Sequence, residues 1–129
     1  MIARRLFFSC CLALAGLAAP AYSAESEQTV QVIVDYGDGS EKHFTQIPWK
    51  SNLNVFAATQ AASRHPRGFK LSSKGSGTTR FVTAIDELKN EGNGRNWIFR
   101  INQKLATRSC ELIEIEPGDV ILWRFQRYE

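Results

Sequence analysis

Alternation of apolar and polar residues with a period of two is the feature that most constrains how this chain folds. The alternation runs through residues 30–36, 97–102 and 121–125. It is typical of a β-strand with one buried face and one face in solvent. Only residues 54–64 have the spacing of an amphipathic helix. A chain with several such strands and one helix is expected to form an α+β domain in which a sheet packs against the helix.

The ends of the expected helix are marked by local signals. Asn54 is a suitable N-cap, and Leu53 before it can act as a hydrophobic staple. The helix should end after Arg64, because His65 precedes Pro66 and the residue before a proline avoids the α conformation. The expected apolar face consists of Val55, Phe56, Ala58, Thr59 and Ala62.

Turn signals divide the rest of the chain into short strands. The Asp38-Gly39 pair predicts a hairpin between the first strand and a second one over 42–47. Residues 67–79 are rich in Gly, Ser, Lys and Thr and are expected to form a loop. Further strands are expected over 81–85 and 112–116. The order favours a β-grasp-like mixed sheet with one main helix packed across it.

The first 23 residues have the pattern of an export signal. Arg4 and Arg5 precede an uncharged apolar stretch over 6–17, and Ala21 and Ser23 stand at the −3 and −1 positions of a cut before Ala24. The alternative is an uncleaved N-terminal anchor, but the apolar stretch is short for a bilayer core of about 30 Å. We therefore expect residues 1–23 to be a cleaved signal peptide and 24–129 to be a periplasmic or secreted domain without a membrane span.

Loss of the signal peptide changes the charge and the cysteine content. The full chain carries a net charge of +3, and removal of Arg4 and Arg5 leaves +1, which gives no reason to expect a nucleic-acid partner. Cys10 and Cys11 are removed as well, so Cys110 cannot form an internal disulfide. We expect Cys110 to be a small buried hydrophobic residue, the alternatives being a reactive thiol or an intermolecular bridge.

The charges of the expected mature chain are segregated in sequence. Residues 24–41 contain five acids and no base, residues 42–85 contain seven bases and no acid, and the remainder contains eight acids and seven bases. One interpretation is a basic surface that attracts anionic glycans, phosphates or an acidic protein. The other is that the acidic and basic stretches lie side by side and neutralise each other. The candidate docking residues are Arg64, Arg67, Lys70, Lys74 and Arg80.

The sequence contains no recognisable catalytic or metal-binding motif. His43 and His65 are the only histidines, and their spacing does not match a zinc site. Counting twelve positions from Asp35 places Gln46 where a calcium loop needs a glutamate. Residues 75–77 lack the lysine of a phosphate-binding loop. We therefore expect neither an enzyme nor a metal site.

Tryptophans are the remaining candidates for ligand contacts. Trp97 and Trp123 alternate with other residues as core positions do. Trp49 lies between Pro48 and Lys50 at the end of a strand, where an exposed ring could stack on a ligand.

Three stretches, taken in order, carry a family resemblance. They are FVTAID at 81–86, NWIFRIN at 96–102 and PGDVILWRF at 117–125, preceded by NVFAA at 54–58. Together they resemble the transcobalamin-like C-terminal domain family over about residues 29–126. The resemblance implies a β-grasp fold of the soluble-ligand-binding kind for residues 24–129. Related domains help to cover the corrinoid in vertebrate cobalamin carriers, and similar bacterial domains are exported without an assigned function.

The chain departs from the family pattern at two turns. Glu87 and Gln103 replace glycines that would permit positive φ angles, so we expect both connections to differ from those of the family. The turn at Gln103 is near the place where a carrier would meet its ligand. The carriers also use a large helical partner domain, which this sequence lacks. A lone β-domain would cover only one side of a corrinoid.

The function expected from these observations is an exported, non-catalytic binding module for a small soluble ligand, with cobalamin as one candidate. The alternative is a module that binds an extracytoplasmic protein or a glycan through the basic segment 42–80. Trp97 and Phe99 face opposite to Arg100 and Asn102, so one pocket can use all four only at the end of their strand. The candidate ligand-binding residues are Trp97, Phe99, Arg100, Asn102 and Trp49.

Overall fold

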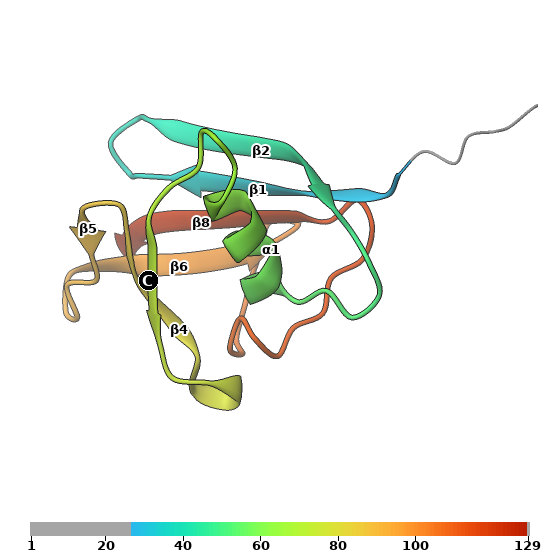
Figure 1. The fold of residues 1–129 in the computed structure, drawn as a ribbon. Coiled ribbons are helices and arrows are strands. Elements are labelled where there is room, and N and C mark those ends of the chain that lie inside the picture. The colour runs from blue at the N-terminus through green and yellow to red at the C-terminus, as the bar shows by residue number, and fades with distance from the viewer. Residues whose placement is uncertain (1–26, 129) are drawn as a thin grey trace, which may run out of the picture.

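The structure is a computed structural model that describes residues 27–128 (Figure 1). The expected signal peptide and its cleavage site lie outside the described residues. A five-stranded sheet has the order β2-β1-β8-β6-β7, and a smaller sheet has the order β3-β4-β5. The elements are β1 (Thr29–Asp35), β2 (Glu41–Pro48), α1 (Val55–Ser63), β3 (Leu71–Lys74), a 3₁₀ turn (Gly77–Thr79), β4 (Phe81–Ile85), β5 (Leu88–Lys89), β6 (Arg95–Ile101), β7 (Lys104–Leu105) and β8 (Val120–Arg127).

The large sheet is mixed, as the sequence predicted. β1 pairs with β2 in an antiparallel hairpin, and β8 then lies parallel to β1 in the centre of the sheet. β6 pairs antiparallel with the other edge of β8. Figure 1 shows α1 lying across one face of this sheet. The α+β, β-grasp-like arrangement is therefore confirmed.

The hairpin turn and the helix cap follow the local signals. The Tyr36 N–H donates to the Ser40 carbonyl (3.0 Å) across the Asp38-Gly39 turn. The Oδ1 atom of Asn54 accepts a hydrogen bond from the Ala57 N–H (2.7 Å), which satisfies one of the free amides at the start of α1. The helix ends at Ser63, with Arg64 as its C-cap. Its buried residues are the five that the sequence pattern assigned to the apolar face.

Two local predictions were wrong. Residues 71–74 form β3 within the expected loop, because their backbone pairs with β4 while polar side chains occupy an edge strand. Residues 112–116 do not form a strand, and only Glu114 makes an isolated bridge, to Asn54. The Val55 N–H donates to the Ile113 carbonyl, and the Ile115 N–H donates to the Leu53 carbonyl. This segment therefore pairs with the start of α1 instead of joining a sheet.

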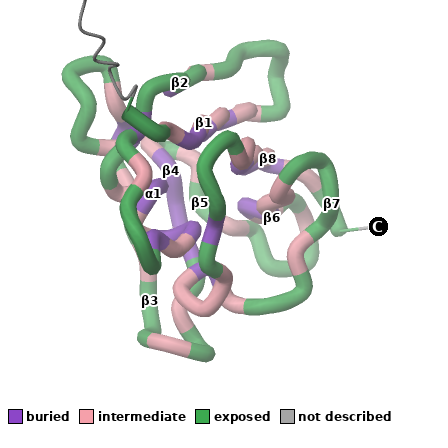
Figure 2. The backbone as a smooth tube through the Cα atoms, turned by 90° about the vertical axis from the view of Figure 1, so that its right-hand side faces the viewer, coloured by how far each residue is buried: buried purple, intermediate pink, exposed green. Residues whose placement is uncertain are grey.

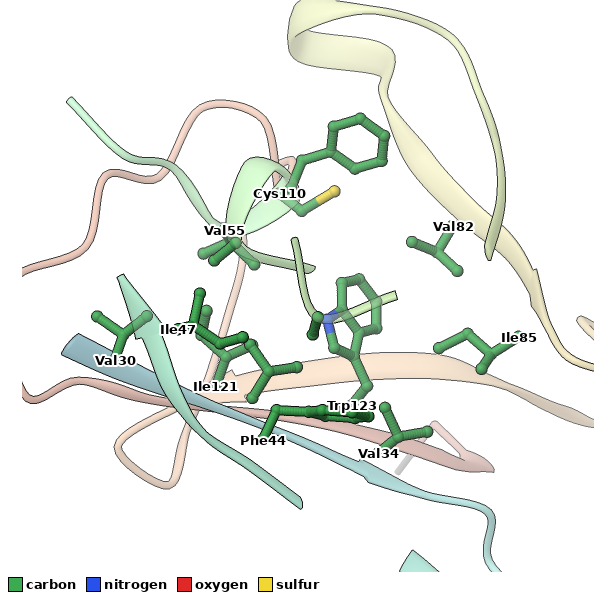
Figure 3. Close-up of a cluster of buried hydrophobic side chains, with 14 of the residues drawn as sticks. Val30, Val34, Phe44, Ile47, Val55, Val82, Ile85, Cys110, Ile121 and Trp123 are labelled. Carbon is green, nitrogen blue, oxygen red and sulfur yellow. The ribbon is translucent and has the colours of Figure 1, made fainter. Parts of the chain in front are cut away.

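The hydrophobic core lies between α1 and the inner face of the large sheet. Figure 2 shows buried positions along β1, β4, β6 and β8, and Figure 3 shows Trp123 pointing from β8 into the cluster. Full burial of one such side chain stabilises the fold by about 1.5–3 kcal/mol relative to exposure. Val82 and Ile85 of β4 extend the cluster towards the small sheet. The core thus holds both sheets and the helix in one domain.

None of the helices described within residues 27–128 has the length and apolar character needed to cross a membrane.

Candidate ligand-binding groove

A groove with a volume of about 460 Å³ lies between β4 and β6 and is bounded by the chain segment 106–112. This volume is within the range of about 300–1,000 Å³ that is common for small-molecule sites. β4 belongs to the small sheet and β6 to the large one, so the groove lies where the two sheets meet. Its lining includes Phe81, Trp97, Phe99, Arg80, Arg108, Cys110, Trp123 and Tyr128.

The floor of the groove is an aromatic layer held by hydrogen bonds. Trp97 is buried, and its indole N–H donates to the Leu88 carbonyl (2.9 Å). Phe99 is half-buried, and its ring centroid lies 4.8 Å from that of Trp123. Packed rings with a bonded N–H lose little further conformational freedom when a ligand binds. The floor is therefore a preformed apolar surface.

The rim of the groove carries exposed aromatic side chains. Phe81 is 50% exposed and Tyr128 is 68% exposed. Within residues 27–128, the exposed large hydrophobic side chains are these two and Leu105, so two of the three line the groove. Exposed apolar side chains that gather around a concavity are typical of interaction sites.

One wall of the groove is fixed by a polar network between two distant segments. The Glu111 Oε1 atom accepts hydrogen bonds from the Gly77 N–H (3.0 Å) and from Arg80 Nε (2.9 Å). The Ser109 hydroxyl lies within hydrogen-bond distance of the Gly77 and Arg80 carbonyls (2.8 and 2.9 Å) and accepts from the Glu111 N–H (3.2 Å). These bonds join the 3₁₀ turn to the segment that follows β7 and hold the wall in place.

Cys110 lies at the base of the groove and is buried, as expected from the sequence. Burial raises the pKa of its thiol to about 11, because the thiolate would lose solvation. A thiol with such a pKa is a poor nucleophile at neutral pH. Cys110 therefore serves as a packing residue.

The structure separates the four ligand residues expected on one strand. Trp97 and Phe99 line the groove. Arg100 lies on the opposite face of β6, where its Nη1 donates to the Gln126 Oε1 atom (2.6 Å). Asn102 is in the β6–β7 turn and bonds to Asp119 (2.9 Å). The alternation predicted this separation, and the groove lies along the strand and not at its end.

Trp49 does not provide a free stacking surface. Its side chain is half-buried against the core, and its indole N–H donates to the Ile115 carbonyl (2.7 Å). The prediction of an exposed ring was wrong, because the ring packs against the core and its N–H is bonded to the backbone at Ile115.

The candidate docking residues differ in exposure and in pairing. Arg64 and Arg67 are exposed after α1, whereas Arg80 pairs with Glu111 (2.9 Å) and stacks over the Phe56 ring with its guanidinium carbon 4.4 Å from the centroid. Lys70 precedes β3, Lys74 is the last residue of β3, and both are exposed.

Among residues 27–128, no Lys or Arg of the basic stretch forms an ion pair with the acidic stretch, although the His43 ring lies 2.8 Å from the Glu41 carboxylate. Asp35 pairs with Arg124 (2.8 Å), and Lys42 pairs with Asp86 (3.8 Å). The ion-pair partners of Lys42 and Arg80 are Asp86 and Glu111, which lie outside the acidic stretch.

The two turns that depart from the family pattern behave differently. Asn102 and Gln103 have φ angles of 50° and 73°, so the β6–β7 turn has the left-handed backbone that glycine would favour. This connection therefore has a left-handed backbone without a glycine. In the β4–β5 turn Asp86 has a φ of 54°, and Glu87 is not among the residues with positive φ. That connection does not require a glycine at position 87.

Among the groove residues that the sequence did not identify are Phe81, Arg108 and Tyr128. Phe81 was visible only as the first residue of a strand, and Tyr128 lies beyond the last alternating stretch. No short-range pattern links them, because they come from β4, from the segment after β7 and from the end of β8. For Phe81 and Tyr128, the one available signal in the sequence was an aromatic residue near the end of a strand.

Metal-binding side chains do not cluster in the described part of the chain. Within residues 27–128 no group of three or more His, Cys, Asp or Glu side chains is placed to hold a metal ion.

Comparison with known proteins identifies the fold and the family. A crystal structure of a "putative metal binding protein" from Ruminococcus gnavus ATCC 29149 is similar, with a TM-score of 0.60 and 14% sequence identity. The similarity covers 80% of this chain and 100% of that chain, and at this identity it shows the fold alone. No curated protein matches the sequence. Residues 55–127 match the family described as "Domain of unknown function (DUF4430)", which is more than half of the chain, and the protein therefore belongs to that family.

Proposed function

We propose that this protein is an exported, non-catalytic binding module whose small soluble ligand occupies the groove between β4 and β6. The observation that carries the proposal is the position of Phe81 and Tyr128, which are exposed at the rim of a groove with an aromatic floor. Exposed rings above a preformed apolar surface can be covered by a ligand with little loss of side-chain freedom.

The chemistry of the groove supports binding over catalysis. Among the described residues that line it there is no His, Asp or Glu to act as a general base. The Cys110 thiol has a raised pKa and is buried, so it is poorly suited to nucleophilic attack. The remaining polar groups are hydroxyls and guanidinium groups, which orient a ligand.

A corrinoid is the first ligand to test. The motifs over 81–86, 96–102 and 117–125 resemble those of transcobalamin-like domains, and each of them includes residues that line the groove. A complete corrinoid is larger than a groove of about 460 Å³. The groove would therefore hold one edge of the macrocycle and leave the other side to solvent or to another protein.

Calorimetric titration of the purified protein with cobalamin and with cobinamide tests this ligand. We expect saturable binding of one ligand per chain, weakened several-fold or more by Phe81→Ala and by Tyr128→Ala. Leu105→Ala is the matched control, because Leu105 is a similarly exposed hydrophobic residue that lies outside the groove. Flat titrations up to the solubility limit would refute the corrinoid proposal.

Fluorescence gives an independent reading of where a ligand binds. Trp97 and Trp123 line the groove, and Trp49 does not. In a Trp49→Phe variant the signal comes from the two groove tryptophans, and quenching of that signal should follow the calorimetric binding curve. Binding without any change in this signal would place the ligand elsewhere.

Export is part of the proposal and is supported by the pattern of residues 1–23. Fractionation of the native host followed by mass spectrometry should find a mature chain that begins at Ala24. A full-length chain in the cytoplasmic fraction would contradict it.

A further inference from the structure

The groove between β4 and β6 has an unbalanced charge. Among the described residues that line it, Arg80 and Arg108 are the charged ones, and both are basic. A concave surface with one sign of charge and apolar walls concentrates the field of that charge. The groove thus favours a ligand that carries a negative group.

The two arginines are in different states. Arg80 donates from Nε to Glu111 (2.9 Å) and from Nη1 to Ser73 (3.1 Å), so its charge is already compensated. Arg108 is exposed, and within residues 27–128 no ion pair or side-chain hydrogen bond of its guanidinium is found. Its charge remains available to a ligand.

Hydroxyl donors accompany Arg108 in the lining of the groove. Thr107 is its neighbour in sequence, and Thr78 lies on the 3₁₀ turn that is hydrogen-bonded to the same segment. Ser109, the residue after Arg108, is held by hydrogen bonds of its hydroxyl group with Gly77, Arg80 and Glu111. The Arg108 guanidinium therefore extends from a backbone segment that is held in place.

We propose that the ligand of this groove is an organic anion with a flat apolar body. Its body lies against the rings of Phe81, Phe99 and Tyr128, and its carboxylate, sulfonate or phosphate group binds the Arg108 guanidinium. This inference rests on the proposed function, because it assumes that the groove is the binding site. It adds a specificity determinant, Arg108, and a chemical class of ligand.

A pair of fluorescent naphthalene dyes tests the charge requirement. The sulfonate dye 8-anilino-1-naphthalenesulfonate and the neutral N-phenyl-1-naphthylamine share an aromatic body and differ in the sulfonate. We expect the sulfonate dye to bind at one site per chain and about tenfold more tightly than the neutral dye, because a hydrogen bond to a charged group is the stronger kind. Added salt should weaken only the sulfonate dye.

Variants of Arg108 assign the effect to one side chain. Arg108→Gln should abolish the preference for the sulfonate dye and leave the affinity of the neutral dye unchanged, whereas Arg108→Lys should retain part of the preference. Arg67→Gln is the matched control, since it removes the same charge from an exposed position outside the groove. Near-UV circular dichroism and thermal unfolding of each variant verify that the dyes bind a folded chain.

The outcomes separate this inference from the proposed function. If both dyes bind with equal affinity, Phe81→Ala and Tyr128→Ala weaken both, and Arg108→Gln changes neither, the groove is a binding site and the charge requirement is wrong. If neither dye binds to the folded protein, or if Phe81→Ala and Tyr128→Ala leave both affinities unchanged, the groove is not the site. A preference that Arg67→Gln reduces as strongly as Arg108→Gln would also overturn the assignment to Arg108.

Discussion

The indole N–H of Trp123 donates a hydrogen bond to the hydroxyl oxygen of Thr59 at 2.9 Å, and both side chains are buried. The Thr59 hydroxyl in turn donates to the Val55 carbonyl one turn earlier in α1 (2.7 Å). This chain of bonds connects the central strand β8 to the middle of α1. It also explains how a polar residue is accommodated on the buried face of the helix.

Thr59→Val tests this connection. Valine has nearly the same shape but no acceptor, so the Trp123 N–H would remain buried without a partner, at a cost of about 1–3 kcal/mol. We expect a loss of this size in the free energy of unfolding measured with urea. Thr45→Val on the exposed face of β2 is the control and should change the stability by less than about 0.5 kcal/mol. Equal effects of both substitutions would show that the hydrogen bond does not contribute.

Asn54→Ala tests the cap of α1. The substitution removes the acceptor of the Ala57 N–H and should cost about 1 kcal/mol of unfolding free energy. Asn54→Asp keeps an oxygen in the same position and should retain most of the stability. An alanine variant as stable as the parent would show that backbone pairing with the segment over 112–116 fixes the helix start without the cap.

The strands and the helix could be predicted because each has one buried face, and a period of two or 3.6 residues reports that face directly. β3 escaped the prediction because the pairing of its backbone with β4 places polar side chains on a partly exposed edge. The segment over 112–116 was misassigned for the opposite reason. Ile115 is buried, but the backbone there pairs with the start of a helix.

The groove could be predicted only in part. Trp97 and Phe99 stand out because they lie on one face of a strand, but Arg108 and Tyr128 reach the groove from segments that are distant in sequence. Their approach depends on how β4 crosses β6, which no local pattern encodes. Likewise, only the fold shows that Glu111 compensates the charge of Arg80. From the sequence alone, Arg80 and Arg108 are equivalent charges.

The two turns give opposite predictions for the same substitution. Gln103→Gly should stabilise the protein by about 0.5–1 kcal/mol, because Gln103 has a φ of 73° and glycine relieves the strain of that conformation. Glu87→Gly should lower the stability by a similar amount, because position 87 does not have a positive φ and glycine only adds freedom to the unfolded chain. The urea midpoints of the two variants should therefore shift in opposite directions. Shifts in the same direction would refute this assignment of the turns.

The stability of the protein should fall in acid partly through Asp86. Burial of the Asp86 carboxylate pushes its pKa up, but hydrogen bonds from the Lys70 N–H and the Tyr36 hydroxyl, together with the charges of Lys42 and Lys70, bring the pKa below its ordinary value of 3.8. A carboxyl with a lowered pKa in the folded state stabilises the fold above the unfolded-state pKa. That contribution is lost as the pH falls through the folded-state pKa.

Asp86→Asn isolates this contribution. The variant should be less stable than the parent at pH 7, and the difference should shrink as the pH is lowered from about 5 to 2. Urea unfolding at each pH gives the two curves. Glu116→Gln, at an exposed position outside this cluster, is the control and should follow the parent. If the free energies of unfolding of the Asp86 variant and the parent differ by the same amount at every pH, the ionic role of Asp86 is excluded.

Alkylation of Cys110 tests whether the base of the groove is closed in the native state. With a pKa of about 11, the thiol carries roughly a hundredfold less thiolate at pH 8 than an ordinary cysteine, and burial restricts access further. Iodoacetamide should therefore label the native protein at least about a hundredfold more slowly than the protein in urea. Cys110→Ser supplies the unlabelled control. Rapid labelling of the folded chain at Cys110 would show that the groove opens to its base, and the packing role of this residue would then be wrong.

Alkylation in urea also counts the thiols of the chain. One labelled site is expected if Cys10 and Cys11 leave with the signal peptide, and three are expected if they remain.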